Sequence, residues 1–374
     1  MNKELLKIFF KPLTVVNKIK KKDNHQIFFY SNLGFRDNVK ALYDYLIDRN
    51  YNEKFKIVVS INDYEDYKDN APKNVKFVDN KEGIKHFLKS KYAFYCFGKY
   101  PIKPGKDQVV VNLWHGTPLK CLGNLEEGFE DVDYHFFTNV VTASEMYIPI
   151  MADIFGCDES EVDVLGYPRN DEMFVPNKLL DTSIRRGCNN LIVWLPTYRE
   201  YNDDFFIPIL NQKELEELNR TLKTHNNRII IKLHPMQKVD VSEFKFSHID
   251  IFTEEQLNQN NMTVYAILRN ADGLISDYSS VYFDYMLLDR PLAFTVSDIK
   301  EYGQKRGFIF ESPTDYMPGE VVKSKEDVVR FINTVEFNVD SHRFDRRDIN
   351  ELMNKFKDGN SAQRIAKYYI REND

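Results

Sequence analysis

Two histidines stand directly after runs of β-branched residues. VVVNLW is followed by His115, and RIIIKL is followed by His234. Residues that follow the strands of a parallel sheet often face ligands, because such sheets bind ligands beyond the carboxyl ends of their strands. An imidazole can accept a proton from an attacking hydroxyl or donate one to a leaving group. The pair therefore indicates general acid–base chemistry, and two unrelated structural histidines are the alternative.

The residues after His115 are Gly116, Thr117 and Pro118, within HGTPLK. Glycine lets the backbone approach a ligand closely, proline fixes the turn, and threonine offers a hydroxyl and an N–H group. The segment is therefore typical of an anion or hydroxyl site, or of an ordinary turn beside a structural histidine.

A third candidate is DGLISDYSSVYFDYMLLDRP, residues 272–291. A short apolar run ends at Ser276, and Ser279 and Ser280 precede a run with helical spacing. Free N–H groups and hydroxyls at a helix start can bind phosphate, although serine is also a favoured N-cap. Asp284 in the first turn either complements the helix dipole or accepts hydrogen bonds from a ligand hydroxyl.

Two arginines follow prolines in loop-like sequence, Arg169 in GYPRND and Arg199 in LPTYRE. Guanidinium groups match phosphate with two parallel hydrogen bonds, so both are candidate diphosphate clamps, with plain surface arginines as the alternative. HExxH, GxGxxG and GxxxxGK[ST] are absent from the sequence. We therefore expect neither a metal nor a cofactor.

The elements that must position these residues alternate between strands and helices, which predicts parallel βαβ units. The candidate strands are 26–31, 56–61, 75–79, 93–97, 108–114, 134–138 and 162–166 in the first half, and 190–196, 228–234, 249–253, 272–276 and 291–296 in the second. The pattern predicts an α/β protein of two doubly wound, Rossmann-like domains that face each other across a cleft.

The length of 374 residues also favours two domains, since single cores stop growing below this size. Prolines and a glycine interrupt the periodicity between residues 166 and 190, so we expect domains at 23–175 and 176–345. Residues 346–374 are expected to form a C-terminal helix, capped by Asn360 or Ser361, that packs back on the first domain.

The first 22 residues mix apolar side chains with lysines. The apolar ones are Leu5, Leu6, Ile8, Phe9, Phe10, Leu13, Val15, Val16 and Ile19, and the lysines are Lys3, Lys7, Lys11, Lys18, Lys20, Lys21 and Lys22. This pattern favours a segment lying on an anionic lipid surface, with a helix docked on its own domain as the alternative.

The composition narrows the class of protein further. Hydrophobic residues make up 43% and charged residues 29%, as in ordinary folded proteins, and the net charge of -6 argues against nucleic-acid binding. The four cysteines form no CxxC pair, which fits a reducing cytosol. No run of 18 apolar residues and no signal-peptide pattern appears, so we expect no membrane span.

Six blocks of sequence, taken in order, resemble the CDP-glycerol glycerophosphotransferase family of teichoic acid and capsule polymer synthesis. They are WHGTPLK (114–120), GYPRND (166–171), PTYR (196–199), KLHP (232–235), SDYSSVYFDYMLLDRP (276–291), and Tyr302 with RGF (306–308). The resemblance covers about residues 110–310. It implies a GT-B fold, CDP-activated alditol donors, a lipid-linked or polymeric acceptor, and a peripheral location on the cytoplasmic face of the bacterial membrane.

The resemblance also implies roles for individual residues. His115 corresponds to the base that deprotonates the acceptor hydroxyl, and His234 is the second catalytic histidine. The implied substrate contacts are Gly116, Thr117, Pro118, Leu119, Arg169, Pro196, Thr197, Arg199, Lys232, Leu233, Asp277, Ser279, Ser280 and Asp284. In the implied reaction the acceptor hydroxyl attacks the phosphorus that bears glycerol, and CMP departs. We expect the two imidazoles, one from each domain, to converge on a diphosphate held at Ser279 and Ser280.

Three other functions stay open at this point. The donor could be CDP-ribitol, since the depth of the pocket around the alditol decides between glycerol and ribitol and no sequence motif indicates that depth. The same architecture also hosts glycosyl transfer from nucleotide sugars. A non-catalytic protein that binds lipid surfaces is the third alternative.

Overall fold

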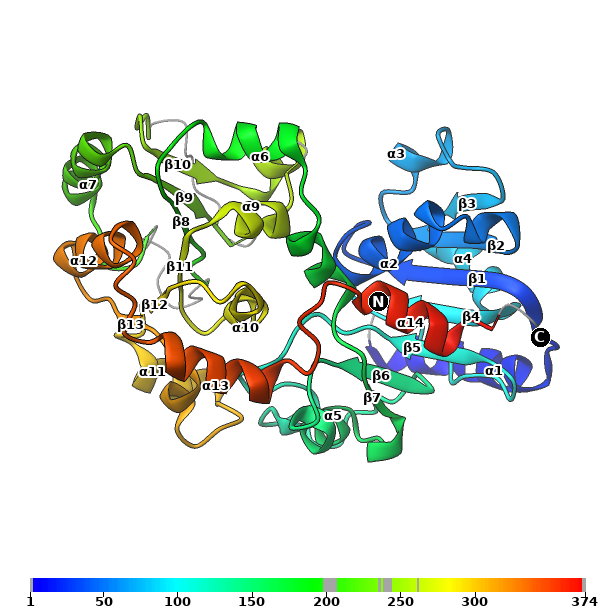
Figure 1. Ribbon diagram of the computed structural model, residues 1–374. Helices are drawn as coiled ribbons and strands as arrows, with labels where there is room; N and C mark the ends of the chain where they lie inside the picture. Colours follow the sequence, from blue (N-terminus) through cyan, green and yellow to red (C-terminus); the bar gives the residue numbers. More distant parts are fainter. Residues whose placement is uncertain (1–2, 198–206, 235–236, 238–243, 261, 372–374) are drawn as a thin grey trace. The chain divides into compact units, whose positions relative to one another are not determined.

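The computed structural model describes residues 3–197, 207–234, 237, 244–260 and 262–371, with side chains from Phe10 onward. The chain folds into two compact units (Figure 1). The first unit holds the residues up to Gly116, Leu122–Asp171 and the residues from Lys355 onward, and the second holds Thr117–Cys121 and Glu172–Asn354. Both are α/β units with parallel sheets, so the predicted fold class is confirmed.

The first unit contains a seven-stranded parallel sheet in the order β3-β2-β1-β4-β5-β6-β7. Its strands are β1 (Asp23–Ser31), β2 (Lys56–Ile61), β3 (Val75–Val78), β4 (Ser90–Tyr95), β5 (Val109–Asn112), β6 (Asn139–Thr142) and β7 (Val162–Val164). Its helices are α1 (Lys3–Ile19), α2 (Asp37–Asp48), α3 (Glu65–Lys68), α4 (Asn80–Phe87), α5 (Tyr147–Phe155) and α14 (Ser361–Tyr369). The strand order reverses between β1 and β4, which makes this pair the topological switch point.

The core of the first unit explains why these segments fold as they do. On α2 the apolar residues Val39, Leu42 and Leu46 recur with helical spacing and pack on the strands. Ile365 of α14 belongs to the same core, and α14 contacts α2. The expectation that the last helix packs back on the first domain is therefore confirmed.

The second unit contains a six-stranded parallel sheet in the order β10-β9-β8-β11-β12-β13. Its strands are β8 (Leu191–Trp194), β9 (Arg228–Lys232), β10 (Ile249–Phe252), β11 (Gly273–Ser276), β12 (Leu292–Phe294) and β13 (Glu320–Val321). Its helices are α6 (Lys178–Arg185), α7 (Gln212–His225), α8 (Glu254–Gln259), α9 (Val264–Asn270), α10 (Val281–Tyr285), α11 (Ile299–Arg306), α12 (Lys325–Glu336) and α13 (Arg343–Met353). Here the strand order reverses between β8 and β11.

The prediction of a strand at 134–138 is wrong. The strand in this region is β6, which begins directly after these residues, at Asn139. Phe136 lies beneath the amines of Lys99 and Lys103, at 5.0 and 4.5 Å from its ring centre, so this aromatic run packs against lysines instead of pairing along a strand. β13 was missed because two residues are too short to form a pattern. Residues 346–374 hold the end of α13, a connection and α14 instead of one helix.

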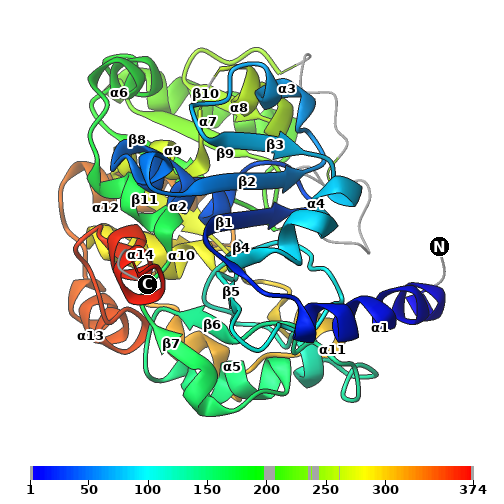
Figure 2. The same ribbon diagram turned by 90° about the vertical axis from the view of Figure 1, so that its right-hand side faces the viewer.

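The N-terminal helix α1 docks on the first unit and extends sideways from its sheet (Figure 2). Asn17 is buried and donates through Nδ2 to the Lys103 carbonyl at 3.0 Å, and the Lys103 N–H donates to Thr14 Oγ1 at 3.2 Å. Val15 and Ile19 face outward, with 62% and 82% of their surface exposed. No helix in the described residues is long and apolar enough to span a bilayer.

Candidate functional site

His115 lies in a strained turn after β5. Trp114 has φ +52°, in the left-handed region that a bulky residue rarely adopts, and Gly116 has φ +116°. Three groups hold the turn. Asn112 Oδ1 accepts the Trp114 N–H at 3.0 Å, and Asn38 Nδ2 and Cys96 Sγ donate to the Trp114 carbonyl at 2.8 and 2.7 Å. These three hydrogen bonds therefore stabilise the turn in its strained, left-handed conformation.

The His115 imidazole is held by aromatic rings. It stacks on Phe97, with ring centres 5.2 Å apart and planes 12° apart, and on Trp114 at 3.9 Å and 29°. The side chain is only partly buried. A ring fixed in its plane and partly open to solvent suits a group that must meet a substrate hydroxyl. Sequence reasoning missed Phe97 as a site residue, although it ends the aromatic run AFYCF.

Arg169 belongs to the same region of the first unit. Its guanidinium pairs with Asp37, Nη1 to Oδ2 at 2.9 Å, and its backbone N–H donates to Asn38 Oδ1 at 3.0 Å. Asn38 thus joins Arg169 to the turn that carries His115. Because Arg169 is 8% exposed and already paired with a carboxylate, any phosphate it binds must share it with Asp37.

In the second unit, two motif blocks meet at the switch point between β8 and β11. Thr197 follows β8, and both its N–H, at 2.8 Å, and its hydroxyl donate to the Asp277 carboxylate. Asp277 follows β11 and is completely buried, and Pro196 before Thr197 is also buried. The carboxylate therefore orients Thr197 at the edge where ligands of such sheets bind.

The neighbouring strand β9 ends in Lys232, followed by Leu233 and His234. Lys232 Nζ lies 2.6 Å from Glu254 Oε2 and is largely buried. Burial, then the positive charges of Lys232 and Lys120, lower the pKa of His234 to about 4. His234 is therefore neutral at pH 7, when it can donate one hydrogen bond and accept another but does not act as a cation.

The segment Thr117–Cys121 pairs with the RGF block. Lys120 and Phe308 form an antiparallel bridge, and the Cys121 N–H donates to the Gly307 carbonyl at 3.3 Å. Gly307 has φ +66°, and a Cβ there would meet Cys121 Sγ at 3.0 Å, so the contact requires glycine. Thr117 and Leu119 are buried, as is Pro118 between them.

An aromatic cluster extends from this contact. The rings of Tyr278 and Tyr302 stack at 4.1 Å, Phe308 lies 5.6 Å from Tyr278, and the Tyr278 hydroxyl donates to Asp298 Oδ1 at 2.8 Å. Three of the six sequence blocks thus form one connected region of the second unit.

The serine pair after β11 does not cap α10 in the usual way. Ser280 has helical dihedrals and no side-chain capping bond, while Ser279 Oγ accepts the Val281 N–H at 3.4 Å. Asp284 is completely buried and accepts the Tyr265 hydroxyl at 2.7 Å. The run with helical spacing that follows these serines forms the five residues of α10 and a 3₁₀ turn, Met286–Leu288.

Residues 13–370 match the family described as CDP-glycerol:poly(glycerophosphate) glycerophosphotransferase. The chain belongs to this family.

This chain is similar to a teichoic acid glycerol-phosphate primase of Bacillus subtilis. The two are 26% identical over 70% of this chain and 68% of the primase. A teichoic acid glycerol-phosphate transferase of Staphylococcus aureus is 24% identical over 89% of each chain. The chain spans about half of the S. aureus ribitol-phosphate polymerase TarK, which is 24% identical over 73% of this chain and 54% of its own length.

Solved structures support the fold. The wall teichoic acid polymerase TagF has a TM-score of 0.74 at 20% identity, covering 98% of this chain and 91% of its own. A UDP-GlcNAc 2-epimerase of Methanocaldococcus jannaschii has a TM-score of 0.52 at 13% identity, covering 93% and 99%.

The site residues predicted from the sequence fall into two groups in the structure. The first unit holds His115, Gly116 and Arg169, and the second holds Thr117, Pro118, Leu119, Pro196, Thr197, Lys232, Leu233, His234, Asp277, Ser279, Ser280 and Asp284. Arg199 lies outside the described residues. The described residues contain no group of three His, Cys, Asp or Glu side chains that could hold a metal.

Proposed function

We propose that this protein transfers glycerol phosphate from CDP-glycerol to a hydroxyl of a teichoic-acid-type acceptor and releases CMP. The observation that carries the proposal is the family match along nearly the whole chain, together with motif residues at the carboxyl ends of β5, β8, β9 and β11. These are the strand ends at which doubly wound sheets bind ligands.

In the proposed reaction His115 accepts the proton of the acceptor hydroxyl. The hydroxyl oxygen forms a bond to the phosphorus that bears glycerol, and the bond from that phosphorus to the CMP oxygen breaks. The stacked rings of Phe97 and Trp114 fix the imidazole, so the base is oriented before the acceptor hydroxyl arrives.

We assign the acceptor to the first unit and the CDP-alditol to the second. Because His234 is neutral at pH 7, its role is a hydrogen bond to a diphosphate oxygen and not charge neutralisation. Arg169, Arg199 and Lys232 remain the candidate cations, and Thr197, Ser279 and Ser280 the candidate hydroxyl donors.

The test measures CMP release from CDP-glycerol with a lipid-linked teichoic-acid-type acceptor. We expect His115→Asn, which keeps a similar shape, to lower kcat by about 100-fold or more, as loss of a general base does. His25→Asn is the matched control, because His25 is exposed in the same unit. Wild-type turnover by His115→Asn would exclude His115 as the base.

Ribitol phosphate transfer is the second candidate, since several relatives are named as ribitol-phosphate polymerases. CDP-ribitol run beside CDP-glycerol decides between the two alditols. A nucleotide sugar labelled in the sugar tests glycosyl transfer, because label would then reach the acceptor without phosphate.

We also propose that α1 rests on the cytoplasmic face of an anionic membrane. Its exposed side carries Val15, Val16 and Ile19 beside Lys11 and Lys18, the combination that binds anionic lipid surfaces.

Sedimentation with phosphatidylglycerol vesicles tests this proposal. The triple change Val15→Ser, Val16→Ser and Ile19→Ser should release the protein, whereas Val339→Ser, at an equally exposed apolar site of the second unit, should not. Equal sedimentation of both variants would show that α1 serves only to dock on its own unit.

A further inference from the structure

A cation in addition to Arg169 lies beside the turn that carries His115. Arg36 ends the loop between β1 and α2, and its guanidinium carbon lies 5.6 Å from the centre of the Phe97 ring. Phe97 in turn stacks on the His115 imidazole, with ring centres 5.2 Å apart. The guanidinium carbon is therefore no farther from the imidazole centre than these two distances together. Arg36 and His115 are both only partly buried, so both side chains can meet a ligand.

The loop that carries Arg36 is anchored to its surroundings. The Asn32 N–H donates to the Phe97 carbonyl at 3.2 Å, which joins the loops that follow β1 and β4. Phe35 is buried in the core, and its N–H donates to Asp63 Oδ2 at 3.2 Å. Arg36 is therefore held near Phe97 before a ligand arrives, which lowers the entropy cost of binding.

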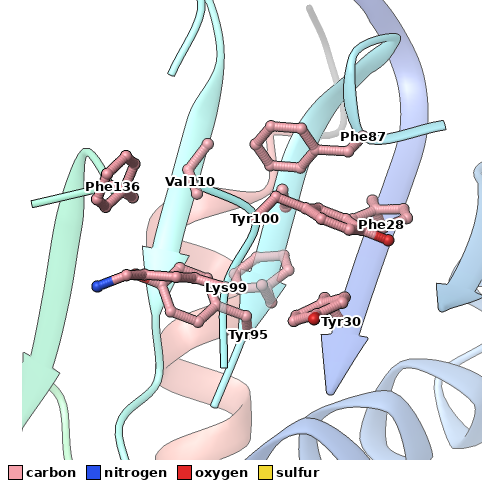
Figure 3. Close-up of a pocket in the computed structure, with 10 residues that line it drawn as sticks. Phe28, Tyr30, Phe87, Tyr95, Lys99, Tyr100, Val110 and Phe136 are labelled. Atoms are coloured by element: carbon pink, nitrogen blue, oxygen red, sulfur yellow. The ribbon is translucent and has the colours of Figure 1, made fainter. Parts of the chain in front are cut away.

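The strand ends behind these loops are tightly packed. Tyr30 and Tyr95 are register partners near the ends of β1 and β4, and the ring centres of Tyr30 and Tyr100 lie 4.4 Å apart (Figure 3). The pocket that these rings line has room for about one water molecule. Substrate therefore has to bind beyond these rings, at the loops that follow the strands.

Two further features favour an anion beside Arg36. The helix α2 has 12 residues and begins directly after Arg36, so the positive end of its dipole lies here. The carboxylate of Asp37 is paired with the Arg169 guanidinium at 2.9 Å and also accepts the Asn38 N–H at 2.7 Å. The charge of Asp37 is thus balanced by Arg169, and Arg36 adds a further positive charge to the region.

We propose that Arg36 binds a phosphate of the acceptor, and that the hydroxyl deprotonated by His115 belongs to the same alditol phosphate unit. The acceptor of this protein then ends in an alditol phosphate and not in a sugar. This inference rests on the proposed function for the role of His115.

The chemistry of the two groups selects this acceptor. An imidazole takes a hydroxyl proton, and a guanidinium matches phosphate with two parallel hydrogen bonds. A hydroxyl and a phosphate joined by the three carbons of glycerol can reach both side chains, since each end adds a hydrogen bond of about 2.8 Å. A terminal sugar would offer His115 a hydroxyl but would give Arg36 no anion.

The first experiment does not depend on turnover. NMR signals of the His115 ring, assigned with His115→Asn, are followed while glycerol 3-phosphate is added to the full-length chain. Glycerol and inorganic phosphate are the comparison ligands, because each lacks either the phosphate or the alditol hydroxyl. We expect glycerol 3-phosphate to shift these signals at a lower concentration than either. Arg36→Met should weaken this binding about tenfold, since it removes a charge-assisted pair, and Arg36→Lys should retain most of it.

Arg49→Met is the matched control. Arg49 lies at the other end of α2, and its guanidinium carbon is 5.7 Å from the centre of the Tyr45 ring, so it makes the same kind of contact with an aromatic ring. Loss of such a contact alone would affect both variants alike, whereas loss of a phosphate site affects only Arg36→Met.

The second experiment measures CMP release with two acceptors on the same lipid, one ending in glycerol phosphate and one ending in a sugar. We expect the wild-type protein to prefer the first. Arg36→Met should raise KM for this acceptor about tenfold and leave KM for CDP-glycerol unchanged.

Three results would overturn the inference: an equal response of the His115 signals to glycerol and glycerol 3-phosphate, equal binding by Arg36→Met and Arg49→Met, or a preference of the wild-type protein for the acceptor that ends in a sugar. Normal turnover of Arg36→Met with an unchanged acceptor KM refutes only this inference. Absent turnover of the wild-type protein with intact binding of glycerol 3-phosphate at His115 refutes only the proposed function.

Discussion

The sharpest prediction concerns Asn38, which secures the turn that carries His115. Asn38 is completely buried and makes three hydrogen bonds. Nδ2 donates to the carbonyls of Trp114 at 2.8 Å and Leu113 at 3.3 Å, and Oδ1 accepts the Arg169 N–H at 3.0 Å.

Asn38→Ala removes all three bonds. The Trp114 carbonyl keeps the Cys96 thiol, so the cost falls mainly on the Leu113 carbonyl and the Arg169 N–H. At about 1–3 kcal/mol for each buried polar group left unpaired, the free energy of unfolding should fall by about 3 kcal/mol. The turn at Trp114 also loses a restraint on its left-handed conformation, and we expect a decrease in kcat of about tenfold or more as His115 loses its orientation.

Two further variants separate these effects. Asn38→Asp keeps the acceptor for the Arg169 N–H but cannot donate to the two carbonyls, so kcat should fall as in the alanine variant. Asn350→Ala removes a comparable buried amide from the second unit, where Asn350 Nδ2 donates to the Met286 carbonyl at 3.0 Å. Urea unfolding gives the stability, and CMP release per folded molecule gives kcat. If Asn38→Ala keeps the kcat of Asn350→Ala, the turn does not position the base.

Three further predictions concern the second unit. Since the pKa of His234 is lowered from 6.5 to about 4, its neutral form contributes stability above pH 6.5 that is lost as the pH falls toward 4. The urea midpoint of the wild-type protein should therefore fall across this pH range. In His234→Gln the urea midpoint should depend less on pH. Lys232→Met should lower the free energy of unfolding by about 2 kcal/mol, which is less than for a fully buried pair because Glu254 is 31% exposed. The added change Glu254→Leu should recover most of this loss in urea unfolding. No recovery would mean that the two side chains are not coupled. Asp277→Asn weakens the acceptor for both donors of Thr197 and should raise KM for CDP-glycerol, whereas an unchanged KM would exclude Thr197 from the donor site.

Local sequence was sufficient for the parts of this protein that depend on local physics. The β-branched runs around Ile57, Val111 and Ile230 predicted strands because such side chains suit a sheet covered on both faces. The helical spacing of Val39, Leu42 and Leu46 likewise accounts for α2, because it places these apolar side chains on one face of the helix. The turn residues that follow the strands placed His115 and His234 at strand ends, which is where the structure has them.

Tertiary structure decided the partners, because a pattern of a few residues carries no information about what packs against it. Asp37 and Asn38 lie about 130 positions from Arg169, and nothing in GYPRND indicates that its arginine pairs with them. The buried positions of Asp277 and Asp284 are decided in the same way.

The same limit explains two further features of the structure. HGTPLK reads as one motif, yet His115 and Gly116 belong to the first unit and Thr117 to the second, since Lys120 pairs with Phe308. Tyr30 and Tyr95 are unremarkable in the sequence and become neighbours only through the register of β1 and β4. Periodicity and turn chemistry therefore determined the elements and their ends, whereas long-range packing decided which side chains share a site.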